Sequence, residues 1–257
     1  MEIPKNLSNF LWLLYSLTLR ELKGKYKSAS LGFIWAFVNP FVQMIVLIIV
    51  FSFFFKIQVE NYPLFILSGI LPWTFFATVL SSGTSSLINS RDLIKKNYFK
   101  REAIPLASVL AGLVQFVVSI IIFLLLAKLL GFNFSGNLLF LPIAIIFETL
   151  LLCGLVLFTS SLDIYFRDVG FIVQAITIVW FYLTPVFYPL SFVPEKYLFL
   201  YKLNPMVGIT SFFRFLFLGS NYLSLDSLFI SIAEICLLLF LGFWLFKKRE
   251  RYFADWI

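Results

Sequence analysis

The chain has 257 residues, of which 61% are hydrophobic and 13% charged, and it carries a formal net charge of +7 without any histidine. Soluble domains carry about 25% charged residues, and several uncharged stretches here reach the ~18 residues that cross a bilayer. These properties exclude a soluble globular protein and indicate one membrane domain with short aqueous loops. The basic residues flank apolar segments, where anionic lipid headgroups account for them and no nucleic acid partner is expected.

The first apolar stretch, residues 7–19, is interrupted by polar residues, and its apolar side chains recur at helical spacing. Basic residues follow this stretch, and it lacks a small-residue cleavage site, so we do not expect a secretory signal peptide. The pattern predicts an amphipathic helix on the cytoplasmic membrane surface. A disordered tail is the alternative.

Six later segments are apolar and long enough to cross a membrane. They are Leu31–Phe55, Leu64–Leu87, Pro105–Leu130, Leu138–Leu162, Phe171–Tyr188 and Ser227–Phe246. If both termini are cytoplasmic, most lysines and arginines fall on the inner side, as the positive-inside rule requires. We therefore expect an all-α protein of six spans with both termini in the cytoplasm.

The segment between the fifth and sixth spans is too apolar for an ordinary loop. Met206–Leu218 is strongly apolar but has only about 13 residues, too few for a span. Asn204-Pro205 should separate two short helices, and irregular backbone at membrane depth is tolerated where protein buries it or where it lines a cavity. The sequence predicts a re-entrant helical hairpin at the outer mouth. Additional partial spans or a flat interfacial helix are the alternatives.

These segments make up a single membrane domain over residues 1–257. Its expected parts are an interface helix with a basic collar (1–30), spans one to five (31–188), the outer re-entrant segment (189–226), and the last span with a basic tail (227–257).

Motifs for enzymatic chemistry are absent from the sequence. It contains no G-x-x-x-x-G-K-[ST] phosphate-binding loop, no H-E-x-x-H, no G-x-S-x-G and no cluster of cysteine and histidine. Cys153 and Cys236 lie in apolar spans and are interpreted as buried thiols. We expect neither an enzyme nor a metal site, and no cofactor bound by this chain; if ATP is used, a separate subunit must bind it.

Two carboxylates, Glu148 and Glu234, lie deep in expected spans. Ionisable groups at that depth are costly and are functional candidates, although a protonated or hydrogen-bonded glutamate that joins helices is an equally open interpretation. Aromatic rings, 20% of the chain, suit the C–H-rich faces of sugars, with lipid anchoring as the alternative for each ring. The candidates for a substrate channel are Trp35, Phe37, Trp180, Phe181, Tyr182, Phe187 and Tyr188.

A series of motifs extends along nearly the whole chain. Residues 25–35 read KYKSASLGFIW, and Asn39-Pro40 follows. A basic loop extends from Asn89 to Pro105. The later motifs are Phe166-Arg167-Asp168-Val169, Thr184-Pro185-Val186, Val193-Pro194, Asn204-Pro205-Met206 and Arg214. In this order and spacing they resemble the ABC-type polysaccharide export permeases, which are the membrane subunits of O-antigen, capsule and teichoic acid exporters. The chain departs from that pattern at Ala29, where the family usually has serine, and at Lys100, where proline is more common.

The resemblance implies a homodimer with two ABC ATPase subunits, which would bind ATP and Mg. Two copies would enclose a pore lined mainly by the first and fifth spans, for a lipid-linked polysaccharide crossing the inner membrane. The implied ATPase-coupling residues are Asn89, Arg91, Asp92, Leu93, Lys95, Lys96, Phe99 and Arg101. The implied outer gate consists of Pro194, Asn204, Pro205 and Arg214, and the cytoplasmic entrance of Lys25, Tyr26 and Lys27.

Three other classes of protein remain as alternatives. An ABC exporter for a drug or a small lipid would share the same architecture. A polytopic membrane glycosyltransferase would need clustered acidic residues in a loop, and an ion- or proton-coupled transporter would need internal repeats and paired charges. The sequence displays neither pattern.

Overall fold

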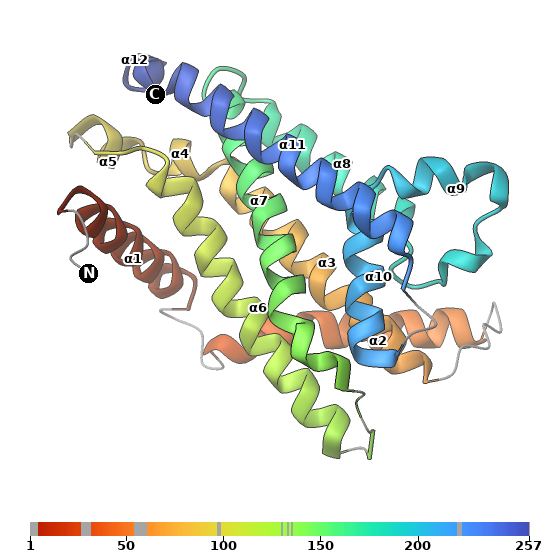
Figure 1. Cartoon of the computed structure of the whole chain (residues 1–257). Helices are drawn as coiled ribbons and strands as arrows, with labels where there is room; N and C mark the ends of the chain where they lie inside the picture. Colours follow the sequence, from red (N-terminus) through yellow and green to blue (C-terminus); the bar gives the residue numbers. More distant parts are fainter. Residues whose placement is uncertain are drawn as a thin grey trace.

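The computed structural model is a bundle of helices, with no strand among the residues that it describes (Figure 1). These residues are 5–26, 32–53, 61–96, 99–129, 131–132, 134, 136–219 and 223–256. The expectation of an all-α protein is therefore confirmed.

The helices follow one another as α1 (Lys5–Tyr26), η1 (Gly32–Ile34), α2 (Trp35–Phe53), α3 (Tyr62–Thr84), α4 (Ser86–Asn89), α5 (Arg91–Lys96), α6 (Ala103–Leu129), η2 (Gly136–Phe140), α7 (Leu141–Asp163), α8 (Val169–Leu183), η3 (Leu190–Phe192), α9 (Glu195–Lys202), α10 (Pro205–Leu218), α11 (Leu225–Arg249), η5 (Glu250–Tyr252) and α12 (Phe253–Trp256).

Four of the described helices are long and apolar enough to cross a membrane: Tyr62–Thr84, Ala103–Leu129, Asn137–Asp163 and Leu225–Tyr252. They correspond to the second, third, fourth and sixth expected spans. The first and fifth expected spans correspond to shorter apolar stretches, Phe37–Phe51 and Val169–Leu183.

Local backbone chemistry determines where α8 ends and where α2 begins. Thr184 has an extended backbone, with φ −105° and ψ 133°, because the following Pro185 disfavours a helical conformation, and α8 therefore ends at Leu183. At the start of the first expected span, Gly32 has φ +49°, and a 3-10 turn precedes the α-helix, which begins at Trp35.

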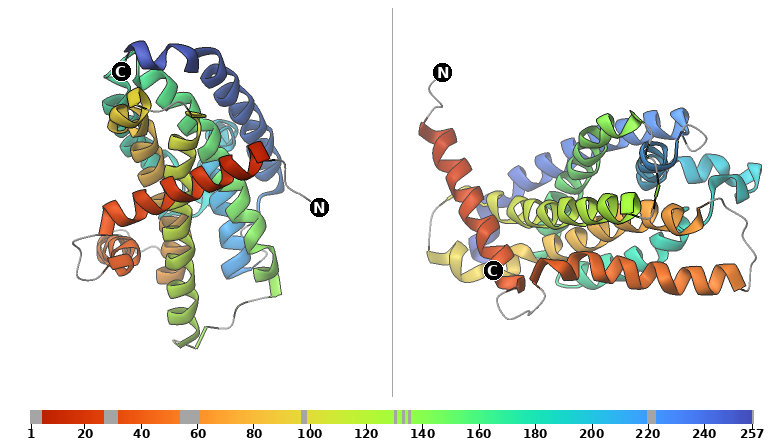
Figure 2. Two further views of the ribbon diagram at one scale, coloured as in Figure 1. Left: turned by 90° about the vertical axis from the view of Figure 1, so that its left-hand side faces the viewer. Right: turned by 90° about the horizontal axis from the view of Figure 1, so that it is seen from below.

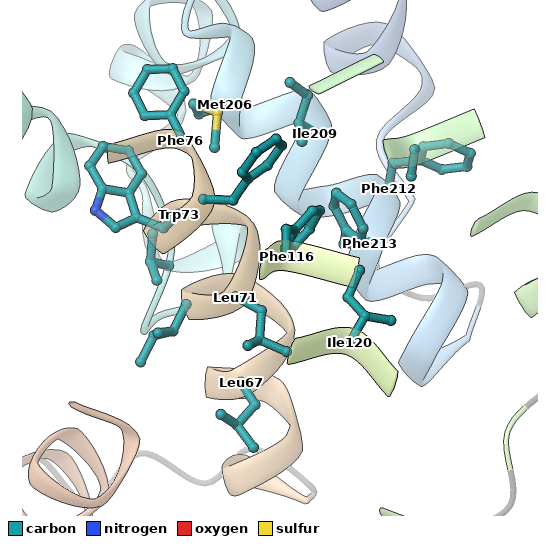
Figure 3. Close-up of a cluster of buried hydrophobic side chains, with 14 of the residues drawn as sticks. Leu67, Leu71, Trp73, Phe76, Phe116, Ile120, Met206, Ile209, Phe212 and Phe213 are labelled. Carbon is teal, nitrogen blue, oxygen red and sulfur yellow. The ribbon is translucent and has the colours of Figure 1, made fainter. Parts of the chain in front are cut away.

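Helix α3 is the centre of the bundle. Of its most apolar window 72% is buried inside the protein, against 17% for α11, so α3 is surrounded by protein and α11 is peripheral. Side chains from α3, α6 and α10 meet in the main hydrophobic core (Figure 3). Within it the ring of Phe116 stacks on Phe75 at 4.6 Å between centroids and meets the edge of Phe213 at 5.7 Å. Such aromatic pairs add to the stabilisation by buried area.

Helices α7 and α11 approach each other through two glycines. A Cβ added at Gly242 would lie 2.2 Å from the carbonyl oxygen of Gly154, and one added at Gly154 would lie 2.7 Å from the backbone of Leu238. Both distances are shorter than any real Cβ contact, and the obstructing atoms belong to the backbone. Small residues that allow close backbone approach are typical of helix pairs in membranes.

One end of the bundle, here called the basic end, is formed by α1, α4, α5, the turn between α7 and α8, and α12 (Figure 1). A second hydrophobic cluster holds these elements together and includes Leu17, Leu87, Ile94, Phe246 and Phe253. Helix α9 lies at the opposite end of the bundle (Figure 1). The N-terminal segment forms a helix from residue 5, as expected, and α1 crosses α6 at a steep angle (Figure 2).

Candidate functional site

The residues expected at the outer gate meet around the start of α10. Asn204 caps this helix, since its side-chain oxygen accepts a hydrogen bond from the backbone N–H of Met206 at 3.0 Å. The same oxygen accepts from the indole Nε1 of Trp180 at 2.8 Å. Its Nδ2 donates to the hydroxyl of Thr184 at 2.9 Å. One side chain thus fixes the end of α8 to the start of α10.

Arg214 extends this arrangement into α3. Its side chain is 3% exposed, Nη2 donates to the carbonyl oxygen of Val186 at 2.6 Å, and the guanidinium lies 3.8 Å from the ring centroid of Phe65. Gly69 leaves room for this contact, because a Cβ there would lie 2.7 Å from the Val186 oxygen. A buried cation is costly unless polar and aromatic groups surround it. We call Trp180, Thr184, Val186, Asn204 and Arg214 the Asn204–Arg214 cluster.

Removing the Asn204 side chain should loosen this cluster. Asn204→Ala eliminates the helix cap and leaves the Trp180 and Thr184 groups without their partner, which should lower stability by about 2–4 kcal/mol. Thr184→Val removes only one of these hydrogen bonds, so it should cost less. The measurement is thermal unfolding of the purified chain in detergent. Equal melting temperatures for the two variants would contradict the central position of Asn204.

Most of the aromatic channel candidates pack inside the protein. Phe187 contacts Phe51 of α2 at 4.8 Å and Phe181 at 5.6 Å between ring centroids, and its carbonyl oxygen accepts from the hydroxyl of Tyr62 at 2.9 Å. Tyr188 donates to the backbone oxygen of Tyr182 at 3.0 Å. These rings therefore pack against other parts of the chain.

The remaining candidates differ in their exposure. Phe37 is buried, whereas Trp35 and Tyr182 are 43% and 61% exposed. Trp35 and Tyr182 are thus the two of the seven that present their rings most openly at the surface of this chain.

Two grooves flank α2. One, of about 640 Å³, lies between α2, α3 and α8, and Trp73, Gln174 and Tyr182 are among its lining residues. The other, of about 680 Å³, lies between α2, α3 and α6 and includes Asn39 and Gln115. Both grooves share three polar residues, Gln43, Thr74 and Thr78. The helices around α2 thus present polar groups within an otherwise apolar bundle.

The expected coupling residues lie at the basic end. Helix α5 is amphipathic: Ile94 is buried in the second cluster, and the charged side chains face outward. The exposed coupling residues are Asn89, Arg91, Asp92, Lys95 and Lys96, whereas Leu93, Phe99 and Arg101 are half-buried. Leu93 and Phe99 pack against the second cluster.

Polar contacts connect residues 90–102 to α1 near the N-terminus and to the C-terminal segment. Arg101 donates to the backbone oxygen of Glu250, and Lys247 pairs with Glu102 at 2.9 Å. Arg20 of α1 donates to the hydroxyl of Ser90 at 3.1 Å. The sequence does not indicate the partners of Glu102, Lys247 and Arg20, because no local pattern pairs residues so far apart in the chain.

The remaining sequence candidates take different positions. Pro194 is exposed and precedes α9, while Pro205 is buried at the start of α10. Lys25 and Tyr26 end α1, and Lys27 lies outside the described residues.

The two acidic candidates lie within the long helices α7 and α11. Glu148 is fully buried, and neither of its carboxylate oxygens has a hydrogen-bond partner among the described residues. Glu234 is half-buried, and its Oε2 also has no hydrogen-bond partner among the described residues. In the described part of the chain no three acidic, cysteine or histidine side chains gather as metal ligands would.

Long apolar helices around a polar-lined α2, with a charged surface helix at one end, define a polytopic membrane protein. The chain belongs to the ABC-2 type transporter family, whose sequence profile matches residues 13–218. The resemblance inferred from the motifs is thereby confirmed. The family is one of transport permeases, so a membrane glycosyltransferase does not fit.

Relatives match over nearly the full length. The chain is 29% identical over 257 residues to the O-antigen export system permease protein RfbA of Myxococcus xanthus. The alignment covers 99% of this chain and 99% of the relative. It is 29% identical over 258 residues to the protein of the same name from Klebsiella pneumoniae, covering 99% of this chain and 98% of the relative. The polysialic acid transport protein KpsM of Escherichia coli is 22% identical over 239 residues, covering 91% and 92%.

Proposed function

We propose that this chain is the channel-forming membrane subunit of an ABC transporter that exports a lipid-linked, O-antigen-like polysaccharide across the inner membrane. The observation that carries this proposal is the match to O-antigen export permeases over 99% of the chain. A relationship over the full length means that the same set of helices would perform the same task.

The proposed topology has six crossings with both termini in the cytoplasm. Helix α2 has 19 residues, and at ~1.5 Å per residue it measures about 28 Å, close to the thickness of the hydrocarbon core. Helix α8 has 15 residues, about 22 Å, and continues in an extended segment after Leu183. The basic end would face the cytoplasm, as the positive-inside rule favours.

Helices α9 and α10 would form the re-entrant hairpin. The start of α10 is inside the bundle, where the hydroxyl of Ser231 donates to the carbonyl oxygen of Pro205 at 3.0 Å. The last turn of α10 contacts the C-terminal part of α6, where the rings of Phe217 and Phe123 lie 5.0 Å apart between centroids. Because α10 is buried among other helices, this arrangement is favoured over a flat interfacial helix. The Asn204–Arg214 cluster would then hold the outer gate closed.

Two copies of the chain would enclose the pore, mainly with α2 and α8. Both helices leave rows of apolar side chains exposed in the single chain, and the 640 Å³ groove lies between them. Tyr182 and Trp35 would offer ring faces to passing sugars, whereas the buried Phe37 and Phe187 would support the wall. Lys25, Tyr26 and Lys27 would lie at the cytoplasmic entrance.

Helix α5 would dock on the ATPase subunit, which holds ATP and Mg. Its charged side is exposed, and Ile94 anchors it to the bundle. A movement of the ATPase subunit would therefore be transmitted to the bundle through this helix. Through the Arg101–Glu250 and Glu102–Lys247 contacts, that movement would be transmitted to α6 and α11 together.

Deleting the gene in its host tests the exported substrate. We expect lipid-linked polysaccharide to accumulate on the cytoplasmic side of the membrane and to disappear from the cell surface, and the wild-type gene should restore export. Surface glycan should be measured beside cytoplasmic lipid-linked glycan. Unchanged glycan together with altered sensitivity to a drug, or with altered lipid export, would favour the alternative class of ABC exporter.

A further inference from the structure

A basic, aromatic pocket of about 460 Å³ lies at the basic end, between the α7–α8 turn and the C-terminal segment. Its wall includes Tyr165 and Phe166 on one side and Lys248, Arg249, Arg251 and Trp256 on the other. The hydroxyl of Tyr165 donates to the backbone oxygen of Arg249 at 3.4 Å, and the rings of Tyr165 and Trp256 lie 5.2 Å apart. The pocket is thus built from two segments that contact each other directly.

Each of the three cations of the pocket lies over an aromatic ring. Arg249 lies 5.0 Å from the ring of Tyr165, Lys248 4.9 Å from Trp244, and Arg251 4.7 Å from Tyr252. Among the described side chains none of these three forms an ion pair, whereas the adjacent Lys247 pairs with Glu102 and Glu250. Stacking on a ring orients a cation without neutralising it. The pocket is therefore a site of concentrated positive charge.

The surroundings of the pocket are apolar and exposed. Phe166 and Trp256 are 62% and 60% exposed, and large exposed side chains continue along the helices at Phe171 of α8 and Phe240 of α11. Tryptophan and tyrosine together with lysine and arginine at the ends of spanning helices mark the membrane–water interface. A ligand here would meet cations at one end and hydrocarbon-facing side chains at the other.

We propose that this pocket binds the phosphate headgroup of an anionic phospholipid, with its acyl chains along α8 and α11. Basic pockets between helices at the cytoplasmic face suit such headgroups. A docked protein would need polar groups opposite the cations, whereas the rim of the pocket consists of exposed aromatic rings. An anionic lipid has a charged headgroup for the cations and acyl chains for the rings. Bound lipid would fasten the α7–α8 turn to the C-terminal segment. The site depends on the membrane position of the basic end and not on what is exported.

Native mass spectrometry of the purified full chain in detergent tests the site, with phosphatidylglycerol and phosphatidylcholine as probes. The triple variant Lys248→Gln, Arg249→Gln, Arg251→Gln should weaken phosphatidylglycerol binding on the order of a hundredfold, as expected for three lost basic groups. The control variant Arg91→Gln, Lys95→Gln, Lys96→Gln removes equal charge from the same end but not from the pocket. It should bind phosphatidylglycerol as the wild type does. Phosphatidylcholine should bind weakly and equally in all three proteins.

Other outcomes would overturn the proposal. Equal weakening in the control variant would mean that the basic end attracts anionic lipid without a site. Competition by inorganic phosphate as effective as that by phosphatidylglycerol would assign the pocket to free phosphate. Unchanged lipid affinity with lost binding of an ATPase partner would assign it to protein docking. If the triple variant does not fold, Lys248→Gln with Arg251→Gln spares Arg249 and should still weaken binding clearly; unchanged binding there also overturns the proposal.

Discussion

Reversing the exposed charges of α5, in the variant Arg91→Glu, Lys95→Glu, Lys96→Glu, should abolish polysaccharide export while the chain still folds and inserts. The three side chains face outward and contribute little to the bundle, so their reversal should leave its packing intact. At a protein interface, opposed like charges cost several kcal/mol, which corresponds to weakening on the order of a hundredfold or more. Co-purification with the ATPase subunit and the amount of surface glycan would measure the effect.

Two controls separate coupling from folding. Lys196→Glu reverses an exposed charge on α9, at the opposite end of the bundle, and should leave ATPase binding unchanged. Ile94→Ala acts on the buried side of α5 and should destabilise the chain by about 2–5 kcal/mol through the cavity it leaves. Normal export by the triple charge variant would contradict the assignment of α5 as the coupling helix.

A large effect on stability is expected at Gly242. A valine there would place atoms against the carbonyl oxygen of Gly154, so α7 and α11 would have to separate along their contact. Because the obstructing atoms are backbone, no side-chain rotation relieves the clash, and Gly242→Val should cost about 3 kcal/mol or more. We expect little folded protein in membranes and a clearly lower melting temperature in detergent.

Gly24 provides a control position with open space around it. It lies at an exposed position on α1, and a Cβ there would have no neighbouring atom within 4 Å. Gly24→Ala should therefore be neutral or slightly stabilising, by about 0.5–1 kcal/mol, because alanine favours the helix more than glycine does. A Gly242→Val protein as stable as Gly24→Ala would show that the two helices can repack without loss.

The buried cluster at the start of α10 was only partly predictable. The break before Pro205 follows from local chemistry, since proline restricts the preceding residue, and α10 indeed begins there. The sequence also placed Arg214 in a short apolar helix. It did not indicate that the guanidinium would lie over Phe65 or bond to the Val186 carbonyl, because these partners come from other helices.

The sequence by itself determined the membrane class, the family and the helix break at Asn204-Pro205. Each of these depends on composition, on the length of apolar runs or on motifs of a few adjacent residues. Tertiary structure alone decided that Phe37 and Phe187 are buried, that Glu102 pairs with Lys247, and that Gly154 and Gly242 touch. The physical reason is that an apolar run fits lipid, a neighbouring helix or a pore equally well. Only the packing of all the helices determines which of these surroundings each side chain meets.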